Sequence, residues 1–416
     1  CALTTAGGVK CWGVNGWGQM GDGTRGTNRL APVEVTGLES GVAAISAGGG
    51  HTCALTTSGG VKCWGANARG EVGDGTSRLR LTPVDVVGLQ SGVVGISSGR
   101  THSCALTLVG GIKCWGSNER GQIGDGTISG TIDNDRLTPV GVLGLTSGAV
   151  SIAGGERHTC AITVGGGVKC WGINDTGQVG DGTSHINRLT PVDVSGLTSG
   201  MAAVSSGWGH TCGLTAAGGA KCWGYDGQGQ LGGGRFGIIE LTPGDVLGLS
   251  SGVRSISAGW SHTCAVTNTG GIKCWGNNEF GEVGDGTSGT DRSTPVDVSF
   301  VINANPDSGI DAGQTFDAGQ TVDAGQTVDA GQTVDAGPSA CSRQTPWHTT
   351  PVVLTDQLPH GGGMPGYSSS IAVDSSGGVH VSHVDGYDHK LLYSYRPAGG
   401  GGWTTSYVSL SDFQDP

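Results

Sequence analysis

The stretch Cys53-Ala-Leu-Thr-Thr-Ser-Gly-Gly-Val-Lys-Cys-Trp-Gly65 decides the fold of this chain. Its pattern, two cysteines ten positions apart followed by Trp-Gly, occurs six times, and the copies begin 51 to 56 residues apart. Short runs of alternating apolar residues fill each unit, separated by Gly, Asp-Gly and Pro. This patterning predicts several short β-strands per unit, joined by tight turns. The copies start at Cys1, Cys53, Cys104, Cys160, Cys212 and Cys264.

A hairpin at the start of each unit brings its two cysteines together. If Thr57-Ser58-Gly59 is a three-residue turn with Gly59 in the left-handed conformation, Cys53 lies directly opposite Cys63. Residues paired in this way have Cβ atoms about 4.5–5.5 Å apart, close enough for a disulfide after modest adjustment. We therefore predict six local disulfides: Cys1–Cys11, Cys53–Cys63, Cys104–Cys114, Cys160–Cys170, Cys212–Cys222 and Cys264–Cys274.

Two other states of these cysteines stay open from the sequence. Reduced cysteines can fill a core as small apolar residues. Zinc is the second alternative because His51 precedes Cys53 by two residues, but no fourth ligand recurs in the units. Paired cysteines in every unit favour an oxidising compartment. We therefore expect an extracellular or cell-surface protein that holds no metal and no cofactor.

Stacking of the units defines the architecture. A unit of four short strands cannot bury both of its faces alone, so the copies must pack around an axis as a β-propeller. The phrases Gly-x-x-His-Thr-Cys, Cys-Trp-Gly-x-Asn-x-x-Gly and Gly-Asp-Gly-Thr resemble the repeat of the regulator of chromosome condensation family, in its secreted bacterial type. The resemblance covers residues 1–302 and implies an all-β propeller of seven four-stranded blades. Six hairpins are present, so we expect a seventh blade in the intact protein.

Two further regions follow the repeats. Asp-Ala-Gly-Gln-Thr-Val recurs with a period of six residues and without Lys or Arg, which is typical of a disordered linker. Beyond it, residues 370–382 alternate around a Gly-Gly turn and predict two strands. This last region resembles the blade repeats of a second secreted β-propeller and is too short to close one. The predicted parts are a propeller (1–302), a low-complexity linker (303–339) and a truncated β-repeat domain (340–416).

Composition narrows the classes of function. The net charge is −12 and no cluster of Lys or Arg occurs, which argues against a nucleic-acid partner. No run of eighteen apolar residues predicts a transmembrane segment. The sequence has no Gly-x-Ser-x-Gly elbow, no P-loop and no His-Glu-x-x-His, so we do not expect an enzyme.

Residues that recur in every unit are better explained by structure than by catalysis. A histidine present in each blade fits one repeated hydrogen bond, and an aspartate before Gly fits a turn. The histidines are His51, His102, His158, His210 and His262, and the aspartates are Asp22, Asp74, Asp125, Asp181 and Asp285. A cluster of acidic and histidine residues lies near the C-terminus. It is explained either by turn and strand-edge positions or by an active site. Its members are Asp374, His380, His383, Asp385, Asp388 and His389.

Positions that differ between the units locate the candidate binding site. The Gly-x-x-His and Asn-x-x-Gly loops follow the same end of the hairpin, so they must share one face of the propeller. Their variable positions are rich in aromatic residues and arginine, the composition of protein-recognition surfaces. The alternative is that these side chains only pack on neighbouring blades. The predicted binding face comprises Trp17, Arg69, Arg100, Arg120, Arg157, Trp208, Tyr225, Trp260 and Phe280.

We therefore predict a monomeric, non-enzymatic module for binding or adhesion that recognises a protein or a carbohydrate. One alternative is a targeting domain of a secreted glycan-acting hydrolase, with the active site in residues 340–416. A second alternative, implied by the eukaryotic members of the family that it resembles, is nucleotide exchange on a small GTPase.

Overall fold

The computed structural model describes residues 1–129 and 135–299, together with five strands between residues 354 and 408. The first sheet has three strands, β1 (Ala2–Leu3), β2 (Val9–Gly13) and β3 (Arg29–Glu34). Five four-stranded sheets follow: β4 (Val42–Ala47), β5 (His51–Thr56), β6 (Val61–Gly65), β7 (Arg80–Asp85); β8 (Val93–Ser98), β9 (His102–Thr107), β10 (Ile112–Gly116), β11 (Arg136–Gly141); β12 (Ala149–Gly154), β13 (His158–Thr163), β14 (Val168–Gly172), β15 (Arg188–Asp193); β16 (Met201–Ser206), β17 (His210–Thr215), β18 (Ala220–Asp226), β19 (Ile238–Asp245); β20 (Val253–Ala258), β21 (His262–Thr267), β22 (Ile272–Gly276), β23 (Arg292–Asp297).

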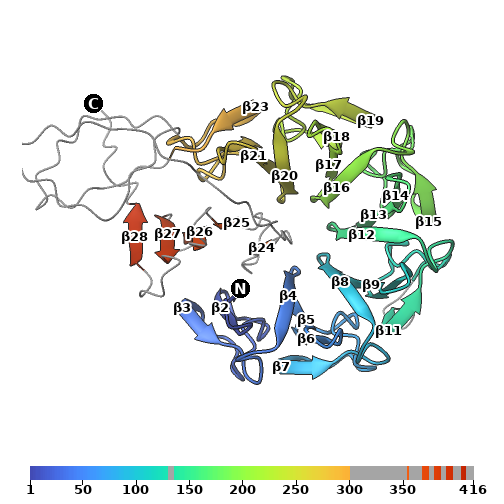
Figure 1. Ribbon diagram of the computed structural model, residues 1–416, viewed down its shortest axis with the longest axis vertical. Helices are drawn as coiled ribbons and strands as arrows, with labels where there is room; N and C mark the ends of the chain where they lie inside the picture. Colours follow the sequence, from blue (N-terminus) through green and yellow to red (C-terminus); the bar gives the residue numbers. More distant parts are fainter. Residues whose placement is uncertain are drawn as a thin grey trace, which may run out of the picture. The chain divides into compact units, whose positions relative to one another are not determined.

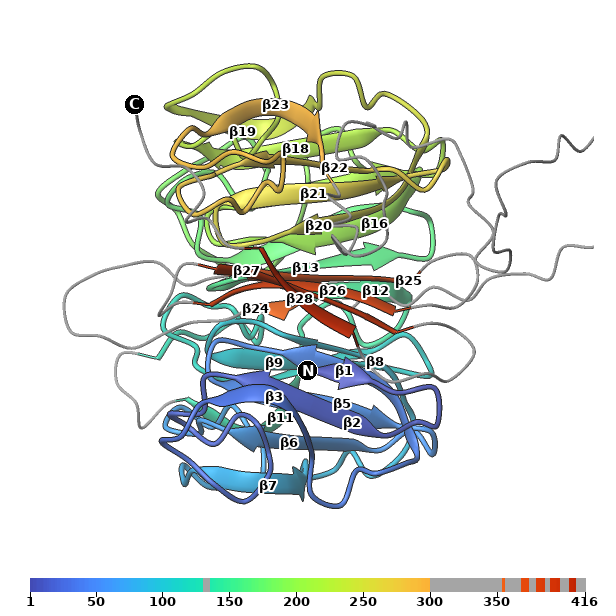
Figure 2. The ribbon, with the colours of Figure 1, turned by 90° about the vertical axis from the view of Figure 1, so that its left-hand side faces the viewer.

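These sheets are the blades of a β-propeller. Within each blade the strands are antiparallel and lie side by side in chain order. The first strands of successive four-stranded blades contact one another and surround a common axis (Figure 1). A view turned by 90° shows β5, β6 and β7 next to one another within one blade (Figure 2). The all-β propeller is therefore confirmed with six blades in residues 1–299, and the expected seventh blade stays a prediction.

The hairpin register agrees with the sequence-based prediction. Cys53 lies opposite Cys63 and Leu55 opposite Val61. The turn is closed by a 2.8 Å hydrogen bond from the Thr56 N–H to the Gly60 carbonyl. Gly59 has a φ of 79°, a left-handed conformation that glycine adopts without steric cost. Each of the six cysteine pairs is joined in the structure, with Cα atoms 3.9 to 4.1 Å apart.

Each described core is completed by the following blade. In the β4–β7 blade, the Cys53–Cys63 disulfide packs with Val61, Val72 and Leu89. Trp115, which belongs to the next blade, packs into the same cluster and is fully buried. Trp64, Trp171, Trp223 and Trp275 play the same part in the clusters of the other blades. Stacking of the units is thus what buries their apolar faces.

The C-terminal strands form a separate antiparallel sheet, in chain order. The two strands predicted around residues 370–382 are present, with Val373 opposite Val379. The linker (303–339) and the side chains of the 374–389 cluster lie outside what the structure describes, and the domain boundaries stay a prediction. The strands are β24 (Leu354–Thr355), β25 (Ser368–Val373), β26 (Val379–Asp385), β27 (Lys390–Arg396) and β28 (Thr404–Val408).

Candidate binding face

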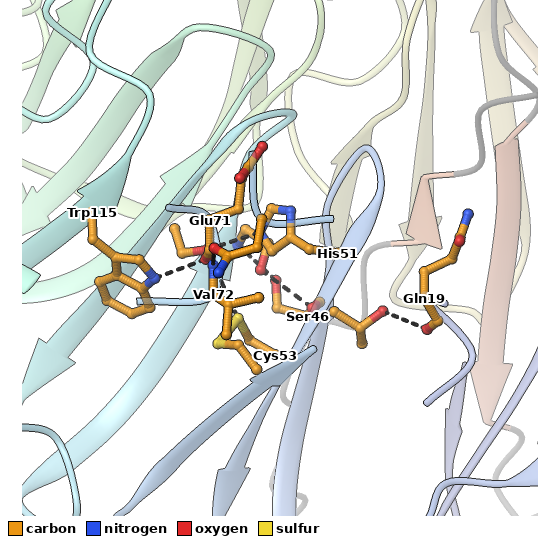
Figure 3. Close-up of a disulfide and its surroundings, with 12 residues drawn as sticks. Gln19, Ser46, His51, Cys53, Glu71, Val72 and Trp115 are labelled. Carbon is orange, nitrogen blue, oxygen red and sulfur yellow. Dashed lines mark hydrogen bonds between the residues drawn. A yellow bond between two sulfur atoms is a disulfide. The ribbon is translucent and has the colours of Figure 1, made fainter. Parts of the chain in front are cut away.

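Four of the recurring histidines belong to hydrogen-bond relays that cross the boundaries between neighbouring blades, and we call these boundaries seams. At the seam after the β4–β7 blade, the Glu71 carbonyl accepts hydrogen bonds from Trp115 Nε1 (2.8 Å) and Ser103 Oγ (3.0 Å) (Figure 3). His51 Nε2 lies 2.8 Å from the same hydroxyl. Because the serine gives its only proton to the carbonyl, His51 must donate through Nε2–H. His51 Nδ1 is buried without a hydrogen-bond partner and burial lowers the pKa of the ring to about 3, so the imidazole is neutral at pH 7 with its proton on Nε2.

The same relay recurs at the next three seams. Burial of these side chains lowers the pKa of His51 to about 3 and that of His102 to about 4. The predicted repeated structural hydrogen bond is thus present at His51, His102, His158 and His210. The first glycine of Gly-x-x-His also has a structural reason, because a Cβ at Gly99 would overlap the His102 ring. The later relays join His102 to Thr159, His158 to Thr211 and His210 to Thr263, each hydroxyl donating to the carbonyl of Gln122, Gln178 or Gln230.

The recurring aspartates form a corner at the start of the outer strand. Asp74 accepts hydrogen bonds from the backbone and hydroxyl of Thr76 and from Arg80 Nε. Partial burial disfavours the charged carboxylate, but the bonds from Thr76 and Arg80 outweigh it and lower the pKa of Asp74. Asn67 fixes the corner through its Nδ2, which donates to the Thr76 carbonyl at 3.0 Å. These aspartates are structural, as the sequence predicted.

The β16–β19 blade departs from this corner at all four positions. It carries Asp226 for the asparagine, Gly233 for the aspartate, Arg235 for the threonine and Glu240 for the arginine. The backbone keeps the repeat geometry, because Asp226 Oδ1 still accepts the Leu231 N–H at 2.8 Å. Asp226 Oδ2 therefore takes the place of a donating amide, and it is buried without a partner. Burial, with the nearby Glu240 charge, raises the pKa of Asp226 to about 6.

The two kinds of variable loop share one side of the propeller, which we call the loop face. In each four-stranded blade the residue after Trp-Gly donates its N–H to a carbonyl of the Gly-x-x-His loop. Examples are Ala66 to Gly50 and Tyr225 to Gly209, both at 2.8 Å. Residues that lie far apart in the sequence therefore meet on this face.

An aromatic cluster on the loop face draws on three blades. The rings of Trp208 and Trp260 stack with centroids 5.8 Å apart and planes at 12°. Tyr225 meets Trp208 edge-on, at a centroid distance of 5.9 Å. The Arg100 guanidinium lies 5.6 Å from the Trp260 ring, although 160 residues separate the two in sequence. All four side chains are half-buried.

An ion-pair network adjoins this cluster through Arg100. Arg100 pairs with Glu156 at 2.6 Å, and Glu156 lies 3.6 Å from Arg157. Arg157 in turn approaches Glu119 at 3.9 Å, and Arg69 pairs with Glu119 at 2.5 Å. The predicted binding face includes these arginines but not the acids, although both charges occur in the same loops. Arg69, Arg100 and Arg157, which were predicted to contact a binding partner, thus form ion pairs with carboxylates of the propeller itself.

The remaining predicted residues lie at one repeated loop position in other blades. Trp17 is 53% exposed, whereas Arg120 and Phe280 are partly buried. The structure therefore gathers Arg100, Trp208, Tyr225 and Trp260 in one cluster, and joins Arg69 and Arg157 to it through acids. In the part of the chain that the structure describes, no three His, Cys, Asp or Glu side chains are grouped to hold a metal. Nor does any described helix have the length and apolarity of a membrane span.

Together these features define a repeat β-propeller with a varied face on an invariant scaffold. The chain belongs to the RCC1-like domain family, whose model matches residues 1–319. This confirms the repeat family predicted from the sequence. RCC1-like propellers are typically binding or exchange-factor domains, and the matching model indicates no catalytic family.

Individual relatives show how widely the repeat is used. The chain is 33% identical over 305 residues to the ultraviolet-B receptor UVR8 of Arabidopsis thaliana, covering 71% of this chain and 67% of that protein. It is 31% identical over 301 residues to the human E3 ubiquitin-protein ligase HERC2, covering 70% of this chain but only 6% of HERC2. These are plant and human proteins, so the secreted bacterial type stays a prediction.

Solved structures agree with the fold. The structure of Prp20p from Saccharomyces cerevisiae, reported with its binding properties to Gsp1p and histones, matches with a TM-score of 0.65 and 20% identity. The match covers 92% of this chain and 82% of Prp20p. Human WBSCR16 matches with a TM-score of 0.63 and 24% identity, over 72% of this chain and 78% of that chain.

Proposed function

We propose that this protein is a non-enzymatic interaction module that grips a protein partner with its loop face. The observation that carries the proposal is the aromatic cluster of Arg100, Trp208, Tyr225 and Trp260, assembled from three blades. Large, rigid aromatic side chains and arginine dominate the binding energy of protein interfaces. Membership of a family of interaction domains supports the same role.

The cluster is preorganised for binding. Stacking and edge contacts fix the ring planes of Trp208, Trp260 and Tyr225 before any partner arrives. A further 3.3 Å hydrogen bond joins the Trp208 N–H to the Trp260 carbonyl. Side chains that are already ordered lose less conformational entropy on association. Half-buried rings of this kind contribute more affinity than the same rings on mobile loops.

The geometry favours a protein over a carbohydrate. A sugar ring binds an aromatic side chain by lying against an open face of that ring. Trp208 covers one face of Trp260, and the Arg100 guanidinium lies over the same ring. Little of that indole is left for a sugar, whereas its edge and the arginine donors suit a protein surface. The glycan-acting hydrolase and the exchange factor stay predictions from the sequence.

The disulfides support a location outside the cell. Six described pairs are joined, one in each blade. Bonds of this kind persist in oxidising compartments and are rare in the cytosol. We therefore place the module on the cell surface or in the extracellular space.

The test compares the two ends of the blades. The full chain is used to select binders from a peptide display library, and the affinity of the best binder is measured for each variant. Trp208→Ala with Trp260→Ala should weaken binding by about 30-fold or more, as expected for two hot-spot residues. Leu108→Ala with Val109→Ala is the matched control, because these residues are 76% and 73% exposed in the turn at the opposite end. Equal affinity of both double variants and the parent would contradict the proposal.

A further inference from the structure

A cavity opens on the loop face between the β16–β19 and β20–β23 blades. Its volume is about 540 Å³, and it is lined by Gln228, Phe236, Asn277, Glu279, Thr290 and Asp291. Two of these side chains are acidic and none is basic. Within the described residues neither Glu279 nor Asp291 is paired with a cation. This shallow cavity, largely open to solvent, therefore carries two acidic side chains on its wall.

The molecule contains a filled version of the same arrangement. Glu119 and Asp135 occupy, in the β8–β11 blade, the repeat positions that Glu279 and Asp291 occupy in the β20–β23 blade. Both aspartates accept the N–H of the repeat asparagine, at 3.1 Å for Asp135 and 2.9 Å for Asp291. No other blade has an acid at both positions. These two sites are thus built alike on the acidic side.

The cation is what differs. Arg69 of the preceding blade bridges the first pair, 2.5 Å from Glu119 and 3.2 Å from Asp135. The residue at the corresponding position before the second site is Gln228, which is neutral and shorter. Its Oε1 is buried without a hydrogen-bond partner. The second site therefore has the carboxylates of the first, but no guanidinium.

We propose that this cavity receives the guanidinium group of an arginine side chain from the protein partner. A guanidinium is a planar fork of five donors that can bridge two carboxylates, as Arg69 does. Phe236 offers an aromatic wall for cation–π contact. Lysine carries a compact charge and bridges two acids less well.

The pKa of a neighbouring, partly buried acid agrees with the missing cation. Burial raises the pKa of Glu282, and the charges of Glu279 and Asp291 contribute to this rise. The site identifies a chemical feature of the partner, so it rests on the proposed function. It is carried by different residues from the aromatic cluster, and the two can therefore be tested separately.

Short peptides test the site on the full chain. The probes are acetyl-Gly-Arg-Gly-amide and the same peptide with citrulline or lysine in place of arginine, with binding followed by nuclear magnetic resonance titration. The arginine peptide should bind about tenfold more tightly than the citrulline peptide, because a charge-assisted contact is lost. Equal affinities for these two peptides would overturn the proposal. Trp208→Ala with Trp260→Ala should leave peptide binding unchanged, which separates this site from the aromatic cluster.

Reciprocal variants supply the second readout. Gln228→Arg introduces the residue of the filled site, so it should raise the melting temperature by about 2 °C and abolish binding of the arginine peptide. Arg69→Gln should lower the melting temperature and create a second site for that peptide. If Gln228→Arg neither stabilises the protein nor removes peptide binding, the two junctions are not equivalent and the proposal is wrong.

Discussion

The seams and the loop face are made by the same repeats, yet they tolerate change very differently. At four of the described seams a histidine, a hydroxyl, a carbonyl and a tryptophan recur with the same partners. On the loop face, one repeat position holds Trp17, Arg69, Thr176 and Gln228 in different blades. A buried polar group that loses its partner is costly, so every seam must be satisfied in the same way. The loop positions also carry contacts between blades, such as the Arg69–Glu119 ion pair and the Trp208–Trp260 stack, but these contacts differ from one pair of blades to the next, so the side chains there can vary and serve recognition.

Lowering the pH should destabilise the seams, and this is the largest effect on stability that we expect. The recurring histidines are buried, and burial lowers the pKa of each to about 3 or about 4. In the unfolded chain their pKa is about 6.5, so below that pH only the unfolded state takes up protons. Stability is therefore lost as the pH falls, by about 7 kcal/mol for five histidines at pH 5.5. This loss is comparable with the whole stability of a typical domain.

Urea unfolding between pH 7.5 and pH 5 measures this loss. His158→Gln keeps a donor for Thr211. Because it removes one group that takes up a proton on unfolding, it should make the free energy of unfolding depend less steeply on pH, by the contribution of one proton. A free energy of unfolding that stays flat over this range would show that the histidines are not buried in the neutral form.

Removal of one seam tryptophan should have the next largest effect. Trp171 is fully buried and donates to the Gln122 carbonyl at 2.9 Å. Trp171→Ala should lower the free energy of unfolding by about 3–5 kcal/mol, because it leaves a cavity and breaks that bond. Trp17→Ala is the matched control on the loop face and should change stability by less than about 0.5 kcal/mol. Equal losses of unfolding free energy in the two variants would show that the loop face matters as much for stability as the seams.

A substitution at the corner of the β16–β19 blade should have the smallest effect on stability, and it should be stabilising. Asp226→Asn restores the donating amide of the other blades, so it should stabilise the protein at pH 7 by about 1–3 kcal/mol. The pKa of Asp226 is raised to about 6 in the folded protein. The parent therefore loses stability relative to the variant as the pH rises toward 6, and the difference should vanish below about pH 4. Thermal unfolding of both proteins across this range is the measurement.

A reverse substitution provides the control for this corner. Asn174→Asp places the same misfit in a regular blade, where Asn174 Nδ2 now donates to the Thr183 carbonyl at 3.0 Å. Asn174→Asp should lower the free energy of unfolding by about as much as Asp226→Asn raises it. If Asn174→Asp is harmless, the unpartnered oxygen of Asp226 is not what destabilises the corner.

Local geometry explains why so much of the fold follows from the sequence. Ten-residue spacing and one left-handed glycine, Gly59, set the register that places Cys53 opposite Cys63. The contact of Arg100 with Trp260 is different, because it depends on how the whole ring curves. Spacing along the chain contains no such information. Face membership was therefore predictable, whereas the pairing of arginines with Glu119, Glu156 and Asp135 was not.

The tryptophan that enters each neighbouring core has a consequence for how the protein is made. Trp115 closes the core of the β4–β7 blade from the next repeat, and the other seam tryptophans act alike. During synthesis a blade emerges from the ribosome with its apolar face open. It stays so until the tryptophan of the following unit, 51 to 56 residues later, has also emerged. Translation thus sets the order in which the blade cores are completed, because each core is complete only after the following unit has been synthesised.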